Sequence, residues 1–246
     1  MIKKIFNTVI RPAINLFGID IIRHEVSSEE IYYPSDFSKE NMLICDAVQE
    51  FTMTSPERVN ALVEAVKYVV KNNIEGALVE CGVWRGGSIM AMALALKQLG
   101  DESRDIYIYD TFAGMVSPTD VDKSTIYGDD HAKEQFSKHK ISEDSSHWLS
   151  SSLEEVKENV LSTGYPKKKL HFIKGKVEDT IPENIPREIA LLRLDTDFYV
   201  STKHELIHLF PLLKPKGVII IDDYAHWLGA KKAVDEYIKK TIFVFF

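Results

Sequence analysis

Residues 79–88, VECGVWRGGS, join a predicted buried strand to a nearly all-apolar helix. Gly82, Gly86 and Gly87 lie between the two elements, where glycine permits a tight turn and lets the backbone approach a ligand closely. The spacing is not the dinucleotide GxGxxG pattern, and the Gly-Lys-Ser/Thr element of a P-loop is missing. An ordinary strand–helix turn would also explain these glycines, so the motif by itself indicates only a strand–turn–helix unit.

The same strand–helix alternation continues along the chain. Strands are predicted at residues 77–80, 105–110, 170–174, 189–195 and 217–222, and helices at 55–72, 88–99, 153–163, 202–210 and 229–239. Capping boxes at Ser152–Glu155 and Thr202–Glu205, and Ser55 before a proline, support three of the helix starts. Repeated β–α alternation predicts an α/β fold, with a parallel sheet and helices on both of its faces.

Two of the later strands end in pairs of carboxylates. They are 192–201, LRLDTDFYVS, which contains Asp195 and Asp197, and 217–227, GVIIIDDYAHW, which contains Asp222 and Asp223. Ligands gather at the carboxyl ends of parallel strands, so these acids should meet in one place. Close carboxylates repel each other unless a hard cation lies between them, which predicts a divalent-metal site. Asp197 has an alternative role as the cap of the helix that follows it.

Length and composition restrict the class of protein. A chain of 246 residues with 45% hydrophobic residues fits one large domain, or one domain with an extension. The net charge of −7 argues against nucleic acid as a partner. Cys45 and Cys81 form neither a disulfide framework nor a zinc spacing, which favours a reducing, cytoplasmic location. No apolar run approaches the roughly 18 residues that a membrane span needs.

Residues 1–50 are predicted to form an N-terminal arm and flap before the main domain at residues 51–246. The segment 1–23 is basic and apolar, so it could lie on a membrane surface as an amphipathic helix. Pro12 and Gly18 interrupt such a helix and favour an arm that packs on the domain or on a second subunit.

Two polar segments do not follow the strand–helix rhythm. Residues 24–50 are expected to form an irregular linker or flap. Residues 113–150 are rich in Ser, Asp, Lys and His and are too long for a simple connection. Because this second segment follows the carboxyl end of a strand, we expect it to be a lid over an acceptor site, with plain disorder as the alternative.

Several motifs in series resemble the macrocin O-methyltransferase family, whose members use S-adenosylmethionine to methylate sugar hydroxyls and are related to catechol-type O-methyltransferases. The motifs are FTMTSPERV, VECGVWRGGS, YDTFAGM, GKVEDTIP, RLDTDFYVST and DDYAHWLGAKKAVDEY. The likeness runs from about Phe51 to Tyr237 and leaves the first fifty residues outside. It implies a Rossmann-like, doubly wound and mostly parallel sheet of the class I methyltransferase type, with a shortened C-terminal end.

The resemblance also implies the residues of a donor site and a metal site. The donor site would hold the methionine moiety at Gly82 and Ser88, the ribose at Asp110, and the adenine near Val177 and Glu178. The whole predicted cofactor set is Thr52, Met53, Glu80, Gly82, Gly86, Ser88, Asp110, Thr111, Val177 and Glu178. The implied ligands of Mg²⁺ are Asp195, Asp222 and Asp223. The position of Asp110 at a strand tip suits ribose hydroxyls independently, although this residue could also cap the next segment.

The expected reaction is attack by a sugar or polyol hydroxyl, oriented by the metal, on the sulfonium methyl group. Catechol-type enzymes carry a lysine base three residues after the first metal aspartate, and Phe198 stands at that position here. Asp195 and His226 are therefore the candidate bases. Arg193, inside an apolar strand, is expected to pair with a buried acid rather than with substrate.

The predicted partners are a small-molecule or glycan acceptor and further copies of the chain. The final TIFVFF is expected to form an apolar, unpaired edge strand, because related chains usually continue through two more strands; with the N-terminal arm it favours a homo-oligomer. Two other hypotheses are weaker. A non-catalytic relative of the fold would not need the acids and the glycine motif. A nicotinamide-dependent oxidoreductase is expected to carry the GxGxxG motif, which is absent.

Overall fold

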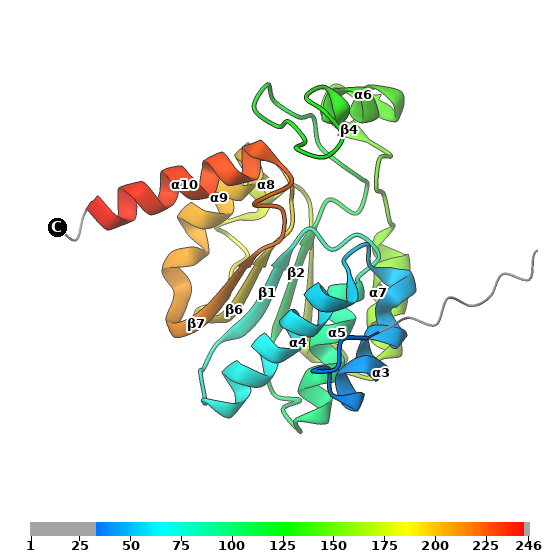
Figure 1. Cartoon of the computed structure of the whole chain (residues 1–246), viewed down its shortest axis with the longest axis vertical. Helices are drawn as coiled ribbons and strands as arrows, with labels where there is room; N and C mark the ends of the chain where they lie inside the picture. The colour runs from blue at the N-terminus through cyan, green and yellow to red at the C-terminus, as the bar shows by residue number, and fades with distance from the viewer. Residues whose placement is uncertain (1–32, 244–246) are drawn as a thin grey trace, which may run out of the picture. The chain divides into compact units, whose positions relative to one another are not determined.

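The computed structural model describes residues 33–243. The chain divides into two units, Met1–Ser35 and Asp36–Phe246, and the second contains every element discussed below (Figure 1). The predicted N-terminal arm, with its possible membrane contact, lies outside the described residues. Within the described part, no helix is both long and apolar enough to cross a membrane.

Five parallel strands form the central sheet in the order β5-β2-β1-β6-β7. The strands are β1 Ala77–Cys81, β2 Ile106–Asp110, β5 Leu170–Lys174, β6 Ile189–Leu194 and β7 Leu213–Ile221. The chain first adds strands outward from β1 and then returns to place β6 on its other side. This reversal creates a switch point between β1 and β6, where doubly wound sheets bind ligands. The predicted α/β fold is confirmed.

Helices cover both faces of the sheet (Figure 1). On one face lie α4 Pro56–Lys71 and α5 Gly87–Gln98, with α3 Lys39–Val48 and α7 Leu153–Ser162 packed against them. On the other lie α8 Val177–Thr180, α9 Tyr199–His208 and α10 Leu228–Phe243. Short 3₁₀ turns occur at Gln49–Phe51, Lys167–Lys169 and Phe210–Leu212. The predicted apolar stripe of the 55–72 helix is fully buried.

The expectation of an irregular 24–50 segment is wrong for its second half, because residues 39–48 form α3. Ser38 caps this helix through its side chain, and Ile44, Cys45 and Val48 are buried. The helix also buries Asn41, whose side chain bonds to three polar residues of α4, namely Asn60, Glu64 and Lys67. The segment thus forms a packed helix because it has an apolar face to bury, and because its buried polar side chain finds partners on a neighbouring helix.

Two predicted boundaries near the C-terminus are also wrong. Helix α9 begins at Tyr199, so the Thr202–Glu205 pair lies inside it; both residues are buried, and the Glu205 carboxylate accepts the Thr196 hydroxyl at 2.9 Å. Helix α10 continues to Phe243, so the first part of the predicted apolar edge strand is helical. The edge of the described sheet on this side is β7.

The 113–150 insertion is folded. It contains α6 His131–Lys138 and an antiparallel pair, β3 Lys140–Ser142 with β4 Ser145–Ser146. Its two ends bond to each other, from the Met115 N–H to the Trp148 carbonyl at 2.9 Å. Its middle bonds to the loop after β7 through Thr125 and His226, at 2.9 Å. Figure 1 shows this insertion, in green, beyond the carboxyl ends of the strands.

Candidate functional site

A cavity of about 700 Å³ lies at the carboxyl ends of β1, β2, β6 and β7. Its walls come from the turns after these strands, the segment before α4, and the insertion. All predicted site residues line this cavity with one exception, Gly86. The fold therefore brings the predicted donor residues and the predicted metal residues into one space, while the role of each residue stays a prediction.

The glycine turn after β1 has a packing requirement that the sequence did not reveal. Gly82 has φ +81°, and a Cβ there would lie 2.0 Å from the backbone oxygen of Asp195. Gly86 has φ +89° and faces Val156 and Val160 of α7. The close approach of Gly82 is thus to the end of β6, which brings the two halves of the cavity together, and Gly86 serves the packing of a helix.

Asp110 braces the same turn from the tip of β2. One of its carboxylate oxygens accepts the N–H groups of Val83, at 2.8 Å, and Trp84, at 3.3 Å. The other accepts the N–H of Phe112 at 2.7 Å. Burial raises the pKa of Asp110, while these backbone donors oppose that rise. The predicted capping role is therefore present, and the same side chain lines the cavity where the ribose is expected.

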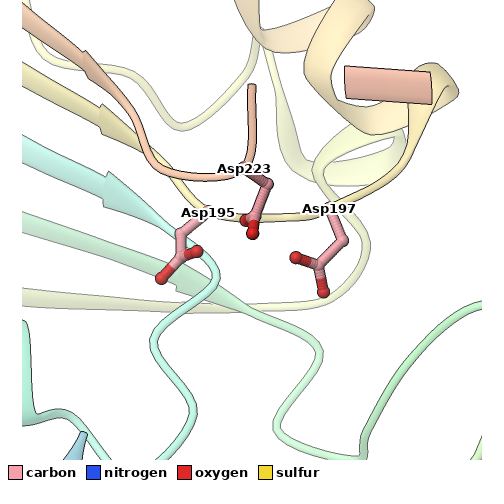
Figure 2. A group of neighbouring side chains, drawn as sticks. All are labelled: Asp195, Asp197 and Asp223. Carbon is pink, nitrogen blue, oxygen red and sulfur yellow. The ribbon is translucent and has the colours of Figure 1, made fainter. Parts of the chain in front are cut away.

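Three carboxylates form a compact acidic cluster at the ends of β6 and β7. Asp195, Asp197 and Asp223 each offer one oxygen atom, and these atoms lie within 4.8 Å of one another (Figure 2). Asp197 enters the cluster because its backbone is left-handed, with φ +66°. The alternative role of Asp197 as a helix cap is wrong, since α9 begins after Phe198 and receives its cap from another residue.

Asp222, a predicted metal ligand, is not a member of this cluster and faces two guanidinium groups. It accepts Arg193 at 2.7 Å and Arg58, of α4, at 3.1 Å. Successive side chains at a strand end point to opposite faces of the sheet. Asp222 therefore points to the α4 face and Asp223 to the side of Asp197, so one of two adjacent aspartates joins the cluster.

The chemistry of the cluster fits a hard divalent cation. Burial raises the pKa of Asp197 to about 7 and that of Asp223 to about 9, and it raises the pKa of Asp195 well above its usual value. Asp223 is only 7% exposed, and its Oδ2 has no hydrogen-bond partner among the described residues. Closely spaced oxygen donors that are partly or fully buried, one of them without a partner, are what a Mg²⁺ site provides.

Phe198 and His226 are the two other positions that concern the predicted catalytic base, and their surroundings differ. Phe198, at the catechol-type lysine position, is buried against Trp227. His226 stacks on Trp227 with ring centroids 4.7 Å apart, and burial lowers its pKa. Its Nε2 is buried without a partner among the described groups. A neutral imidazole with a free nitrogen can accept a proton, so the geometry is compatible with the predicted role of His226.

Sequence reasoning missed an aromatic wall of the cavity. Its members share ring contacts and line the cavity: Tyr127, His131, Trp148 and Trp227. The first three come from the insertion, whose polar composition hid them. The signal that could have revealed them is the presence of bulky aromatic residues in a segment otherwise made of polar residues.

Comparisons with known proteins give the family. A family model described as Macrocin-O-methyltransferase (TylF) matches residues 23–242. The chain belongs to this family. The family match includes residues 23–50, so the expectation that the first fifty residues lie outside the resemblance is wrong.

Individual relatives agree with this family. The chain is 35% identical over 174 residues to 8-demethyl-8-(2,3-dimethoxy-alpha-L-rhamnosyl)-tetracenomycin-C 4'-O-methyltransferase of Streptomyces olivaceus, covering 71% of this chain and 62% of that protein. It is 33% identical over 186 residues to demethyldecarbamoylnovobiocin O-methyltransferase of Streptomyces niveus, covering 76% and 67%. The solved O-methyltransferase NovP is 31% identical, with a TM-score of 0.66 over 78% of this chain and 74% of that one.

These findings have two consequences for the macrocin O-methyltransferase assignment. The chain aligns with 62% of the length of the first relative, which is less than two thirds. The activity of that relative is therefore not carried over directly and enters below as a proposal. The family and the solved relative are methyltransferases, which bears out the family resemblance and leaves the nicotinamide reading without support.

Proposed function

We propose that this protein is an S-adenosylmethionine- and Mg²⁺-dependent O-methyltransferase that acts on a hydroxyl of a sugar or glycosylated metabolite. The observation that carries the proposal is the one cavity that both the glycine turn after β1 and the acidic cluster at the ends of β6 and β7 line. A donor site and a cation site one strand apart suit transfer between two bound reactants. Family membership supports the same activity.

Each half of the cavity has residues suited to one reactant. When bound, S-adenosylmethionine supplies an activated methyl group and Mg²⁺ supplies positive charge that lowers the pKa of an alcohol. The turn at Gly82, with Asp110 behind it, would hold the donor. The acidic cluster of Asp195, Asp197 and Asp223 would hold the cation. The aromatic wall would exclude water and present flat faces to the acceptor, as ring faces suit the apolar side of a sugar.

The proton of the acceptor hydroxyl needs a base within hydrogen-bond reach. Asp195 and His226 were the predicted candidates, and Asp197 joins them because its carboxylate lies in the cluster. Substitution distinguishes them. The variants His226→Gln and Asp197→Asn are compared. The variant that removes the base should have a lower kcat and should lose one limb of the pH profile of kcat. Both variants should bind S-adenosylhomocysteine as the wild type does.

The relatives' names support a glycosylated acceptor. One is named for a rhamnosyl-tetracenomycin substrate and the other for demethyldecarbamoylnovobiocin. The proposal that the present chain takes a related glycoside is tested by methyl transfer to a panel of glycosides and to the corresponding free sugars and aglycones. Transfer to aglycones alone would contradict the sugar assignment.

Calorimetry with S-adenosylhomocysteine, with and without Mg²⁺, tests the donor site directly. We expect micromolar-range binding in at least one condition, and the absence of binding in both would refute the enzyme proposal. Asp223→Asn and Asp222→Asn form a matched pair for the metal, read out by Mn²⁺ binding in paramagnetic resonance. We expect Asp223→Asn to weaken Mn²⁺ binding, and the effect of Asp222→Asn decides whether the predicted ligand contributes.

A further inference from the structure

A buried arginine lies beneath the floor of the cavity. Arg193 is on β6, is 3% exposed, and is not among the described residues that line the cavity. Its guanidinium donates to three carboxylates that do line it: Glu80, Asp195 at 2.5 Å and Asp222 at 2.7 Å. The sequence-based expectation that Arg193 pairs with a buried acid is confirmed, and the number of its partners is three.

Strand register explains this convergence. Arg193 pairs directly with Glu80 of β1, so the two side chains share a face of the sheet. Asp195 follows the last residue of β6, and its carboxylate accepts the Arg193 guanidinium at 2.5 Å. Asp222 donates its N–H to the carbonyl of Leu194 at 3.0 Å, which places it beside Asp195. The contacts thus connect β1, β6 and β7 through one planar group.

Each carboxylate held by Arg193 serves a different part of the cavity. Glu80 belongs to the predicted donor site, is 1% exposed, and keeps Oε2 without a hydrogen-bond partner. Asp195 belongs to the acidic cluster. Asp222 also binds Arg58, which lines the cavity from the first turn of α4, and so attaches α4 to the same network. One side chain therefore fixes groups on both halves of the site.

We propose that Arg193 is a positioning residue that sets the orientation of Glu80 toward the methyl donor and of Asp195 toward the cation, so that both sites depend on its planar guanidinium. This inference rests on the proposed function. An arginine presents several donors in a fixed fork, whereas a lysine offers the same charge at a single point. The proposal therefore depends on shape as well as charge.

Arg193→Lys is the direct test, because it keeps the buried positive charge. Two binding constants are measured on the folded variant: S-adenosylhomocysteine by calorimetry and Mn²⁺ by paramagnetic resonance. We expect both to weaken on the order of 10–100-fold, the usual effect of removing a partner that orients ligating groups. Single-site controls should separate the halves: Glu80→Gln should weaken the nucleoside alone, and Asp223→Asn should weaken Mn²⁺ alone.

The outcomes distinguish the inference from the proposed function. If Arg193→Lys binds either ligand within about twofold of the wild type, Arg193 is only a counter-ion and the inference is wrong. If the wild type itself binds no S-adenosylhomocysteine, the proposed function fails first. A variant that does not fold is replaced by a comparison of Glu80→Gln with Glu80→Gln/Arg193→Met, which removes one buried charge of each sign. A Mn²⁺ affinity on the order of 10–100-fold weaker in the double variant than in Glu80→Gln supports the inference. Equal Mn²⁺ affinities in these two variants overturn it.

Discussion

Asp122 of the insertion caps a helix that lies far from it in the sequence. The residue is 2% exposed, and its Oδ1 accepts the N–H of Tyr199, the first residue of α9, at 2.7 Å. Its Oδ2 accepts the N–H and the hydroxyl of Thr119 at 2.7 and 2.6 Å. Phe198, at the N-cap position, makes no side-chain cap, so Asp122 replaces it and ties the insertion to the loop that carries Asp197.

Asp122→Ala should therefore be strongly destabilising. Loss of a helix cap costs about 0.5–2 kcal/mol, and a buried N–H left without an acceptor costs about 1–3 kcal/mol. The two costs overlap at Tyr199, while the Thr119 groups add a further loss, so we expect a decrease of about 2–4 kcal/mol in the free energy of unfolding. With about 2–4 °C per kcal/mol for a domain of this size, Tm should fall by roughly 5–15 °C.

Urea denaturation followed by circular dichroism measures this change, and Asp120→Ala provides the matched control. Asp120 is in the same segment and pairs with Lys133, but its side chain is 94% exposed, so its loss should leave the free energy of unfolding nearly unchanged. Asp122→Asn keeps one acceptor oxygen and should lie between the two. If Asp122→Ala destabilises the protein no more than Asp120→Ala does, the cap across the insertion is not a stabilising contact and the reasoning fails.

Three further predictions concern the cavity. Gly82→Ala should abolish binding of S-adenosylhomocysteine, because its Cβ would lie 2.0 Å from backbone, whereas Gly100→Ala, with a similar φ of +72° but nothing within 4 Å, should retain it; equal binding by calorimetry would contradict the clash. Burial raises the pKa of Asp197 to about 7 and of Asp223 to about 9, so the folded protein holds protons that the unfolded chain loses near pH ~4. Without a cation, thermal scans should show stability falling as pH rises from ~4 to ~9, and Mg²⁺ binding should tighten over the same range. Asp223→Asn should make both the stability and the Mg²⁺ affinity less dependent on pH. If that variant leaves both pH dependences unchanged, Asp223 is not the group that titrates. The side chain of Tyr127 is 63% exposed, and Tyr127→Ala should raise KM for a glycoside acceptor without changing the affinity for S-adenosylhomocysteine. An unchanged KM would show that this part of the aromatic wall does not bind the acceptor.

Local patterns predicted the elements whose partners lie nearby in the sequence. The capping box at Ser152 is present, with its hydroxyl accepting the N–H of Glu155 at 3.1 Å. The apolar stretches 77–80 and 189–195 became neighbouring strands. Prediction failed where a distant group completes an element. Helix α3 has a local cap in Ser38, but the partners of its buried Asn41 lie on α4. Helix α9 takes its cap from Asp122, so its start could not be predicted from its own residues.

The sequence by itself determined the alternating α/β fold, the family, and the placement of carboxylates at strand ends, because each depends on periodicity or on motifs in the order of the chain. Only the tertiary structure decided which carboxylates act together. Asp222 and Asp223 are adjacent in sequence, yet one faces two arginines and the other joins Asp195 and Asp197. The physical reason is that the two faces of a sheet separate successive side chains, while register and the left-handed backbone of Asp197 bring distant ones together.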